Sequence, residues 1–288
     1  MIDEKIKFDG AQIGGIKIHY AQAGDGEKLV ILLHGFPEFW YSWRHQLVAL
    51  SDEYTVVAPD MRGYNLSDKP TNIDDYTINK LADDVTGLIT HFGRKKAAVV
   101  GHDWGASVAW NLAQNHPEYV WKLAALQVPP MSVWKKNQTF RQFMASWYMF
   151  FFQIPSLPEW ILTRSNFALL ENGLKNTTAE KGVFSDDDIE RYKESWSEPF
   201  ALTAMINYYR ANIIKRFFAK SQTEEKIHVP TLFIYGEKDH AVLPETVKNV
   251  GDAVDAPFEY FHIPDAGHWA QQEAAETVTQ MLREFLAD

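Results

Sequence analysis

Short and almost continuously apolar runs recur along the chain, and each is followed by a turn and a helix-like segment. Five of these runs have the composition of strands that are covered on both faces: residues 28–36, 54–60, 96–103, 122–129 and 231–239. Strand–helix alternation of this kind predicts an α/β fold with a mostly parallel central sheet and helices on both faces. The period-two pattern of residues 15–24 predicts a further hairpin strand at the sheet edge.

The alternation stops between residues 130 and 225. This stretch has no strand pattern, and it holds 18 of the chain's 40 aromatic residues. We therefore predict a helical cap at 130–225, inserted into a core made of residues 1–129 and 226–288. An aromatic-rich cap over the carboxyl edge of the sheet would enclose a ligand pocket, although most of these aromatic side chains are expected only to hold the cap on the core.

Composition excludes several classes of function. A net charge of −10 argues against a nucleic-acid partner, since phosphate binding needs clustered Lys and Arg. The absence of cysteine excludes disulfides, thiolate metal sites and thiol catalysis. The acidic start "MIDEKIKFDG" is unlike a signal peptide, and no run approaches the roughly 20 apolar residues of a membrane span. We expect a cytoplasmic protein, and the sequence leaves open whether it forms a homodimer.

The sequence "GHDWGA" places Asp103 between Gly101 and Gly105, after a predicted strand and before a predicted helix. A strand-to-helix turn this sharp presents a nucleophilic serine in many hydrolases, and it needs small residues two positions before and after. Here an aspartate stands in the serine's place. The alternative interpretation is that Asp103 only caps the helix that follows.

A carboxylate nucleophile indicates a particular chemistry. Serine attack on a saturated carbon would give an ether that water does not cleave, whereas carboxylate attack gives an ester that water can cleave at its carbonyl. A carboxylate is also ionised at neutral pH and needs no base to activate it. Asp103 therefore predicts substitution at a saturated carbon, with an epoxide or an alkyl halide as the electrophile.

Cleavage of that ester needs a base for water and an acid that orients the base. In this architecture the chain order is nucleophile, acid, base. His268 in "DAGHW" is the predicted base, and Asp239, just past the strand within the run 231–239, is the predicted acid. Asp265 is a rival acid, although "PDAG" also fits a turn. The run 122–129 ends without a carboxylate.

An oxyanion hole completes the predicted site. The backbone N–H groups of Phe36 and Trp104 are expected to stabilise the tetrahedral intermediate of ester hydrolysis. Pro37 has no N–H and can only shape the loop. His34 and Glu38 are expected to be structural supports.

With these residues in place, the chain resembles α/β hydrolases of the epoxide hydrolase family, in particular the hydrolase domain of the soluble type. The resemblance covers nearly the whole length and rests on these blocks: 34–46, 60–64, 101–106, 237–239 and 266–269. It implies an aspartate nucleophile, a small apolar epoxide and water as reactants, and neither cofactor nor metal.

The resemblance also implies two cap tyrosines that hydrogen-bond the epoxide oxygen. "YMFFFQIP" places one at Tyr148, and "NYYR" places the other at Tyr209. The alternative is a haloalkane or haloacid dehalogenase with the same nucleophile, whose halide cradle usually pairs a tryptophan with an Asn or a second Trp. Trp104 could be half of such a cradle, but the usual Asn position is Pro37. A third interpretation is a hydrolase-fold binding protein without activity, which the complete set of Asp103, Asp239 and His268 argues against.

Overall fold

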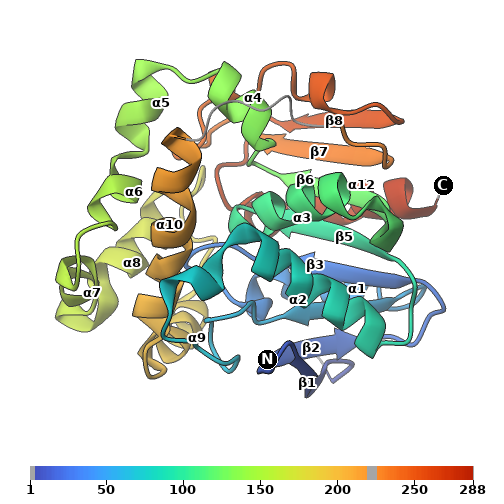
Figure 1. Ribbon diagram of the computed structural model, residues 1–288, viewed down its shortest axis with the longest axis horizontal. Helices are drawn as coiled ribbons and strands as arrows, with labels where there is room; N and C mark the ends of the chain where they lie inside the picture. Colours follow the sequence, from blue (N-terminus) through green and yellow to red (C-terminus); the bar gives the residue numbers. More distant parts are fainter. Residues whose placement is uncertain (1–3, 219–225, 288) are drawn as a thin grey trace.

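An eight-stranded sheet forms the centre of the molecule (Figure 1). The structure, a computed structural model, describes residues 4–218 and 226–287. The strand order across the sheet is β1-β2-β4-β3-β5-β6-β7-β8. The strands are β1 (Lys7–Ile13), β2 (Ile16–Ala23), β3 (Leu29–Leu33), β4 (Thr55–Pro59), β5 (Ala97–His102), β6 (Val120–Leu126), β7 (Thr231–Gly236) and β8 (Phe258–Ile263).

The predicted mostly parallel sheet is confirmed. β1 and β2 form the antiparallel edge hairpin, β2 pairs with β4 antiparallel, and the pairs from β4 to β8 are parallel. Every residue of β3, β4, β5 and β7 is buried, which explains their continuous apolar sequences. The five predicted runs extend one to three residues beyond the observed carboxyl ends, where the chain turns toward the site described below.

Helices cover both faces of the sheet (Figure 1). α2 (Ile78–His91) packs beside α3 (Trp104–Asn115) on one face, and α1 (Arg44–Ala49) packs beside α12 (Ala275–Ala287) on the other. α2 buries one apolar stripe that includes Leu81, Val85 and Leu88. It ends before Gly93, whose φ of +66° favours glycine. The short α11 (Ala270–Glu273) precedes α12.

Seven helices lie between β6 and β7 in the part of the chain that the structure describes; α4 lies at the top of Figure 1, and α5 to α10 form its left side. They are α4 (Met131–Lys136), α5 (Phe140–Ala145), α6 (Trp147–Phe151), α7 (Leu157–Leu162), α8 (Arg164–Asn176), α9 (Asp186–Ser197) and α10 (Ala201–Phe218). The end of the predicted cap, residues 219–225, lies outside the described residues, as do the predicted core's positions 1–3 and 288. Short 3₁₀ segments complete the fold: η1 (Trp40–Trp43), η2 (Ile73–Tyr76), η3 (Pro117–Tyr119), η4 (Pro244–Val247) and η5 (Val250–Ala253).

Within residues 4–218 and 226–287, no helix combines the length and the apolar character that crossing a membrane requires.

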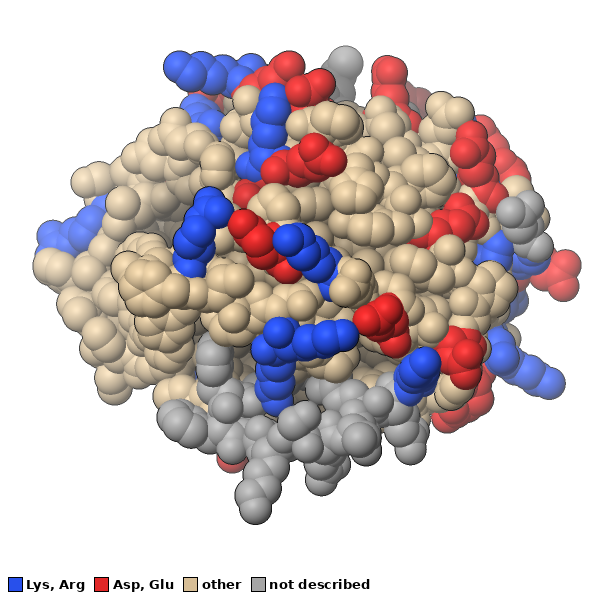
Figure 2. Space-filling view, turned by 90° about the horizontal axis from the view of Figure 1, so that it is seen from above, with Lys and Arg blue, Asp and Glu red and all other residues tan. Residues whose placement is uncertain are grey.

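Charge is distributed unevenly over the surface. Residues 131–158, from α4 into the start of α7, include Lys135, Lys136 and Arg141 but no Asp or Glu, although the whole chain has 38 acidic residues. In the view of Figure 2, the left margin is formed by uncharged and basic residues, and acidic residues gather toward the right margin. The α4–α7 side of the molecule therefore differs in charge from the rest of an acidic protein.

Candidate active site

Asp103 lies at the sharp turn between β5 and α3, with φ 52° and ψ −115°. The glycines two positions before and after Asp103 have no room for a side chain. A Cβ on Gly101 would lie 2.3 Å from the Gly105 carbonyl oxygen, and a Cβ on Gly105 would lie 2.1 Å from that of Leu33. The turn is as sharp as its glycines predict. The Asp103 side chain makes no capping hydrogen bond to α3, so the helix-cap interpretation does not account for it.

The loop after β3 holds one oxygen of the Asp103 carboxylate. The Phe36 backbone N–H donates to Asp103 Oδ1 over 2.9 Å. Gly35 permits this approach, because a Cβ there would lie 2.4 Å from Asp103 Cβ. Trp104 begins α3, where a backbone N–H has no partner within the helix. Both predicted oxyanion donors thus adjoin the candidate nucleophile.

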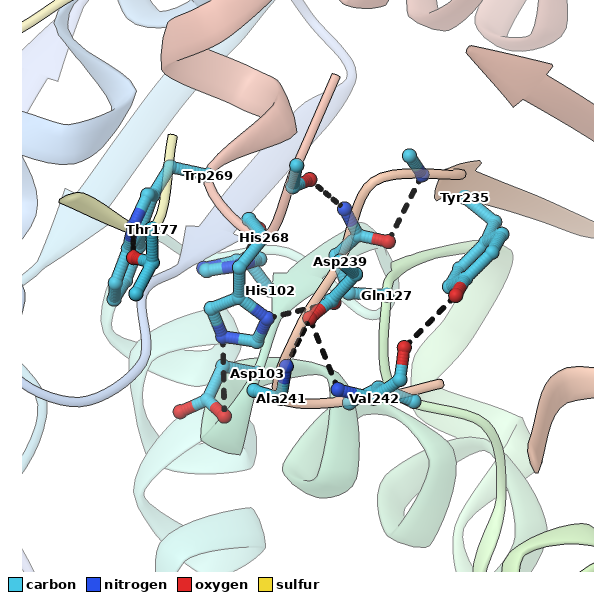
Figure 3. A network of polar contacts seen from close by, with 12 residues as sticks. His102, Asp103, Gln127, Thr177, Tyr235, Asp239, Ala241, Val242, His268 and Trp269 are labelled. Carbon is cyan, nitrogen blue, oxygen red and sulfur yellow. Dashed lines mark hydrogen bonds and ion pairs between the residues drawn. The ribbon is translucent and has the colours of Figure 1, made fainter. Parts of the chain in front are cut away.

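The His268 ring lies between the side chains of Asp103 and Asp239 (Figure 3). The distance from His268 Nδ1 to Asp239 Oδ2 is 2.8 Å, and His268 Nε2 lies 3.7 Å from Asp103 Oδ2. The other Asp239 oxygen accepts hydrogen bonds from the Ala241 and Val242 N–H groups. Asp239 is therefore held in one orientation, and His268 bridges the two carboxylates.

The rival acid does not reach the site. The Asp265 side chain is 81% exposed and pairs with Lys238 Nζ at 2.9 Å. Of the two candidates, Asp239 is the carboxylate that contacts His268.

The electrostatics favour a protonated His268. Burial of the ring lowers its pKa, but the charge and hydrogen bond of Asp239, together with the charge of Asp103, outweigh burial and raise the pKa to about 9. The imidazolium is thus stabilised between two carboxylates while Asp103 is ionised.

Two supports of the site were not predicted from the sequence. Gln127, at the end of β6, accepts from the Gly236 N–H and donates to the Gly267 carbonyl, so it ties together the loops that carry Asp239 and His268 (Figure 3). The run 122–129 has no carboxylate at its end, but it does have the amide side chain of Gln127 there. That amide at the strand end is the signal that could have identified this support.

The second support is His102, the residue before Asp103. Its ring lies 2.8 Å from the buried Glu38 carboxylate through Nδ1 and 2.7 Å from the His268 carbonyl through Nε2. Gln271 and Gln272 also donate to Glu38. Glu38 thus occupies the supporting position that the sequence suggested, and His34 does likewise by accepting from the Met61 N–H.

A cavity of about 200 Å³ opens beside Asp103, and both predicted tyrosines line it. Tyr148 comes from α6 and Tyr209 from α10, and their ring centroids are 5.9 Å apart. Burial raises the pKa of both phenols, and the Asp103 charge raises them further, so both keep their protons at neutral pH. Residues 61 positions apart in the sequence are therefore brought to one cavity.

The remaining cavity wall is mostly apolar, and sequence reasoning identified none of it except Trp104. The other lining residues are Ser107, Val128, Met131, Trp134, Lys135, Gln138, Met149, Ile213 and Val242. The available signal was weak: Met131, Trp134 and Gln138 have the spacing of one helical face on and just after α4. Within the described ranges, no group of three or more His, Asp or Glu side chains could hold a metal ion.

Comparison with known proteins identifies the family of this chain. The family model of the α/β hydrolase fold matches residues 28–275. The chain is 41% identical to the AB hydrolase superfamily protein YfhM of Bacillus subtilis (strain 168), with 98% of each chain covered. It is 38% identical to epoxide hydrolase 3 of Mus musculus, over 99% of this chain and 77% of that protein. It superposes on the epoxide hydrolase of Bacillus megaterium, solved with an inhibitor, with a TM-score of 0.86 and 30% identity, covering 97% of this chain and 100% of that one.

The chain therefore belongs to the α/β hydrolase family. The resemblance to epoxide hydrolases, first seen in short sequence blocks, extends over the whole fold, and the protein is a hydrolase enzyme.

Proposed function

We propose that the protein hydrolyses epoxides to vicinal diols in two steps, through a covalent ester on Asp103. The observation that carries this proposal is a carboxylate at the nucleophile position that shares one cavity with two buried phenols, Tyr148 and Tyr209. The carboxylate suits attack on a saturated carbon, and the phenols suit an oxygen that becomes negative while it stays attached to the substrate.

In the first step, an oxygen of Asp103 attacks an epoxide carbon and the carbon–oxygen bond of the ring breaks. The electron pair of that bond goes to the epoxide oxygen, which takes a proton from Tyr148 or Tyr209. A donor aimed at such an oxygen typically lowers the barrier by ~2.7–4 kcal/mol. The raised pKa values of both tyrosines keep them protonated for this role.

The ester removes the negative charge of Asp103, and with it one of the causes of the high His268 pKa. His268 then passes its proton on to restore the tyrosine and becomes a neutral base, still oriented by Asp239.

In the second step, His268 takes a proton from water, and the resulting hydroxide attacks the Asp103 carbonyl carbon. The N–H groups of Phe36 and Trp104 stabilise the oxyanion, and the 2.9 Å bond from Phe36 to Asp103 supports this role. The intermediate collapses by breaking the ester C–O bond, and the departing alkoxide takes the proton of the newly added hydroxyl, which gives the diol and the ionised carboxylate. His268 keeps the proton, so the resting state is restored.

We infer that helices α4–α10 act as the cap, at residues 130–225, over the core formed by 1–129 and 226–288. In support, α4, α6 and α10 all contribute to the cavity wall. The apolar lining favours a small apolar epoxide. A dehalogenase is not favoured, because several of the similar proteins are epoxide hydrolases and because strong phenolic donors are of little use to a departing halide.

A single turnover in heavy-oxygen water, with enzyme in excess over styrene oxide, tests the covalent route. We expect mostly unlabelled diol, with the label in the Asp103 carboxylate, because water cleaves the ester at its carbonyl. Full labelling of the first diol would mean direct attack by water and would refute the nucleophile role. A parallel assay of halide release from bromobutane separates the dehalogenase alternative.

A further inference from the structure

The outer side of helices α5, α6 and α7 exposes large aromatic side chains. Phe140, Trp147 and Trp160 are 78%, 59% and 55% exposed, and Phe143 and Phe150 are exposed to a lesser degree. We call these five residues the aromatic face. Clusters of exposed large apolar side chains mark interaction sites in soluble proteins more often than scattered ones do. We propose that the aromatic face docks the protein on the surface of a lipid bilayer.

The spacing places four of these side chains on one side of two consecutive short helices. Phe140, Phe143, Trp147 and Phe150 follow each other at three- or four-residue steps along α5 and α6. The rings of Phe143 and Phe150 lie 5.3 Å apart, so the face is continuous across the junction.

The opposite side of the same helices is tied to the core. Gln142 is fully buried and bonds the Ala241 carbonyl and the Leu243 N–H. The helices are thus firmly seated, and their apolar outer side is a regular feature of the surface.

Charge around the aromatic face fits a negatively charged membrane surface. Residues 131–158 contain no carboxylate side chain, and the next acidic residue, Glu159 beside Trp160, has a side chain that is only 17% exposed and pairs with Arg210. The chain as a whole has a net charge of −10. Arg141 is 74% exposed beside Phe140 and pairs with Glu245, and Arg164 stacks on Trp160 with its guanidinium 4.1 Å from the ring centre. Tryptophan and phenylalanine flanked by basic residues are typical of surfaces that lie in the membrane interface.

Anionic headgroups would attract this side and repel the acidic remainder, which sets the orientation (Figure 2). A second copy that docked by the same face would instead bring the arginines of the two molecules together. Charge complementarity therefore favours a bilayer as the occupant.

Docking would also place the cavity next to the lipid phase, in which apolar molecules accumulate. Tyr148 and Met149 of α6 line the cavity from the inner side of the helix whose outer side carries Trp147 and Phe150. An apolar reactant that partitions into lipid would then have a short route to Asp103. The docking itself does not depend on the proposed chemistry and is tested without catalysis.

Flotation with vesicles of phosphatidylcholine and phosphatidylglycerol tests the docking. We expect the wild-type protein to float with the vesicles, less so at high salt, and Trp147→Ser/Trp160→Ser to bind at least about tenfold more weakly. The matched control is Phe8→Ser/Phe261→Ser, which removes two exposed aromatic rings from the edge strands β1 and β8 and should bind like wild type.

A second measurement needs no variant. Vesicles of brominated lipid should quench the tryptophan fluorescence of the wild-type protein, since Trp147 and Trp160 would enter the lipid. No flotation and no quenching would overturn the proposal, as would equal loss of binding in the control pair. A wild-type dimer in sedimentation that the Trp147→Ser/Trp160→Ser variant abolishes, without lipid binding, would assign the face to a second copy and also overturn it.

Discussion

Removing the charge of Asp103 should release the proton that His268 holds. Asp103→Asn keeps the size of the side chain and imitates the neutral ester of the proposed intermediate, and Asp103→Ala is a second uncharged variant. His268 Nε2 lies 3.7 Å from Asp103 Oδ2, and the Asp239 pair at 2.8 Å is untouched by either change. The perturbation therefore acts on one of the two carboxylates that raise the His268 pKa.

The size of the effect follows from the distance. Two unit charges about 4 Å apart interact with about 4 kcal/mol at an effective dielectric constant of about 20, and with about 1 kcal/mol in water. One pKa unit corresponds to about 1.4 kcal/mol, so the loss of Asp103 should lower the His268 pKa by about one to three units. From a starting value of about 9, the His268 pKa of the variant should fall to about 6–8, so at least about half of the His268 rings should be neutral at pH 8.

The measurement is the titration of His268 by NMR of selectively labelled imidazole in the wild type and both variants, with intact mass confirming that the amide introduced at position 103 is retained. Asp265→Asn is the matched control, since its carboxylate is 81% exposed and pairs with Lys238. A His268 pKa that stays within about 0.3 units of wild type in both variants would show that Asp103 does not govern the proton.

The same pKa makes folding stability depend on pH. The pKa of His268 is raised on folding from 6.5 to about 9, so its contribution is complete below pH 6.5 and is lost as pH rises through 9. The loss amounts to about 3 kcal/mol over that window. Urea unfolding at both ends of the window should show a steeper decline for wild type than for His268→Gln, and parallel declines would contradict the assignment.

Three further outcomes follow from the site. His268→Gln should still form the ester but not cleave it, so intact-protein mass spectrometry after epoxide treatment should show the protein plus one substrate; an unmodified mass would mean that His268 is required before the ester forms and would contradict the proposed sequence of steps. Tyr148→Phe and Tyr209→Phe should each slow alkylation by about a hundredfold or more, as measured by stopped-flow tryptophan fluorescence. The double variant should be nearly inactive on epoxides. If its alkylation rate stayed within about threefold of wild type, the two tyrosines would have no role in the mechanism. Gly105→Ala should lower the free energy of unfolding by about 1–3 kcal/mol in urea, because its Cβ would meet the Leu33 carbonyl oxygen at 2.1 Å, whereas Gly173→Ala, where a Cβ meets nothing within 4 Å, should not.

Local sequence determined the sheet and the nucleophile turn. Strands buried on both faces have to be apolar throughout, so β3, β4, β5 and β7 could be predicted without knowing their neighbours. The turn at Asp103 was predictable for a similar reason. Its two glycines are required by contacts within the short segment and with the adjacent strand, and the carboxylate itself indicates the chemistry.

Only the tertiary structure decided which distant groups meet. Asp239 and Asp265 are both aspartates that follow a strand end within two or three residues, and the choice between them depends on which of the two contacts His268 in the folded protein. No periodicity in the sequence predicts that Tyr148 and Tyr209 line the same cavity. Only the resemblance to epoxide hydrolases suggested it.

The supporting residues of the site and the residues of the cavity wall could not be predicted from the sequence, for the same physical reason. Gln127 and His102 act through backbone groups of residues that are remote in sequence, and those contacts exist only once the strands lie side by side. The residues of α4 line the cavity because of where that short helix packs, and an apolar side chain has the same sequence pattern whether it faces a cavity or the core. Spacing along the chain thus determines elements and turns, whereas the distances between elements that make a site come from packing.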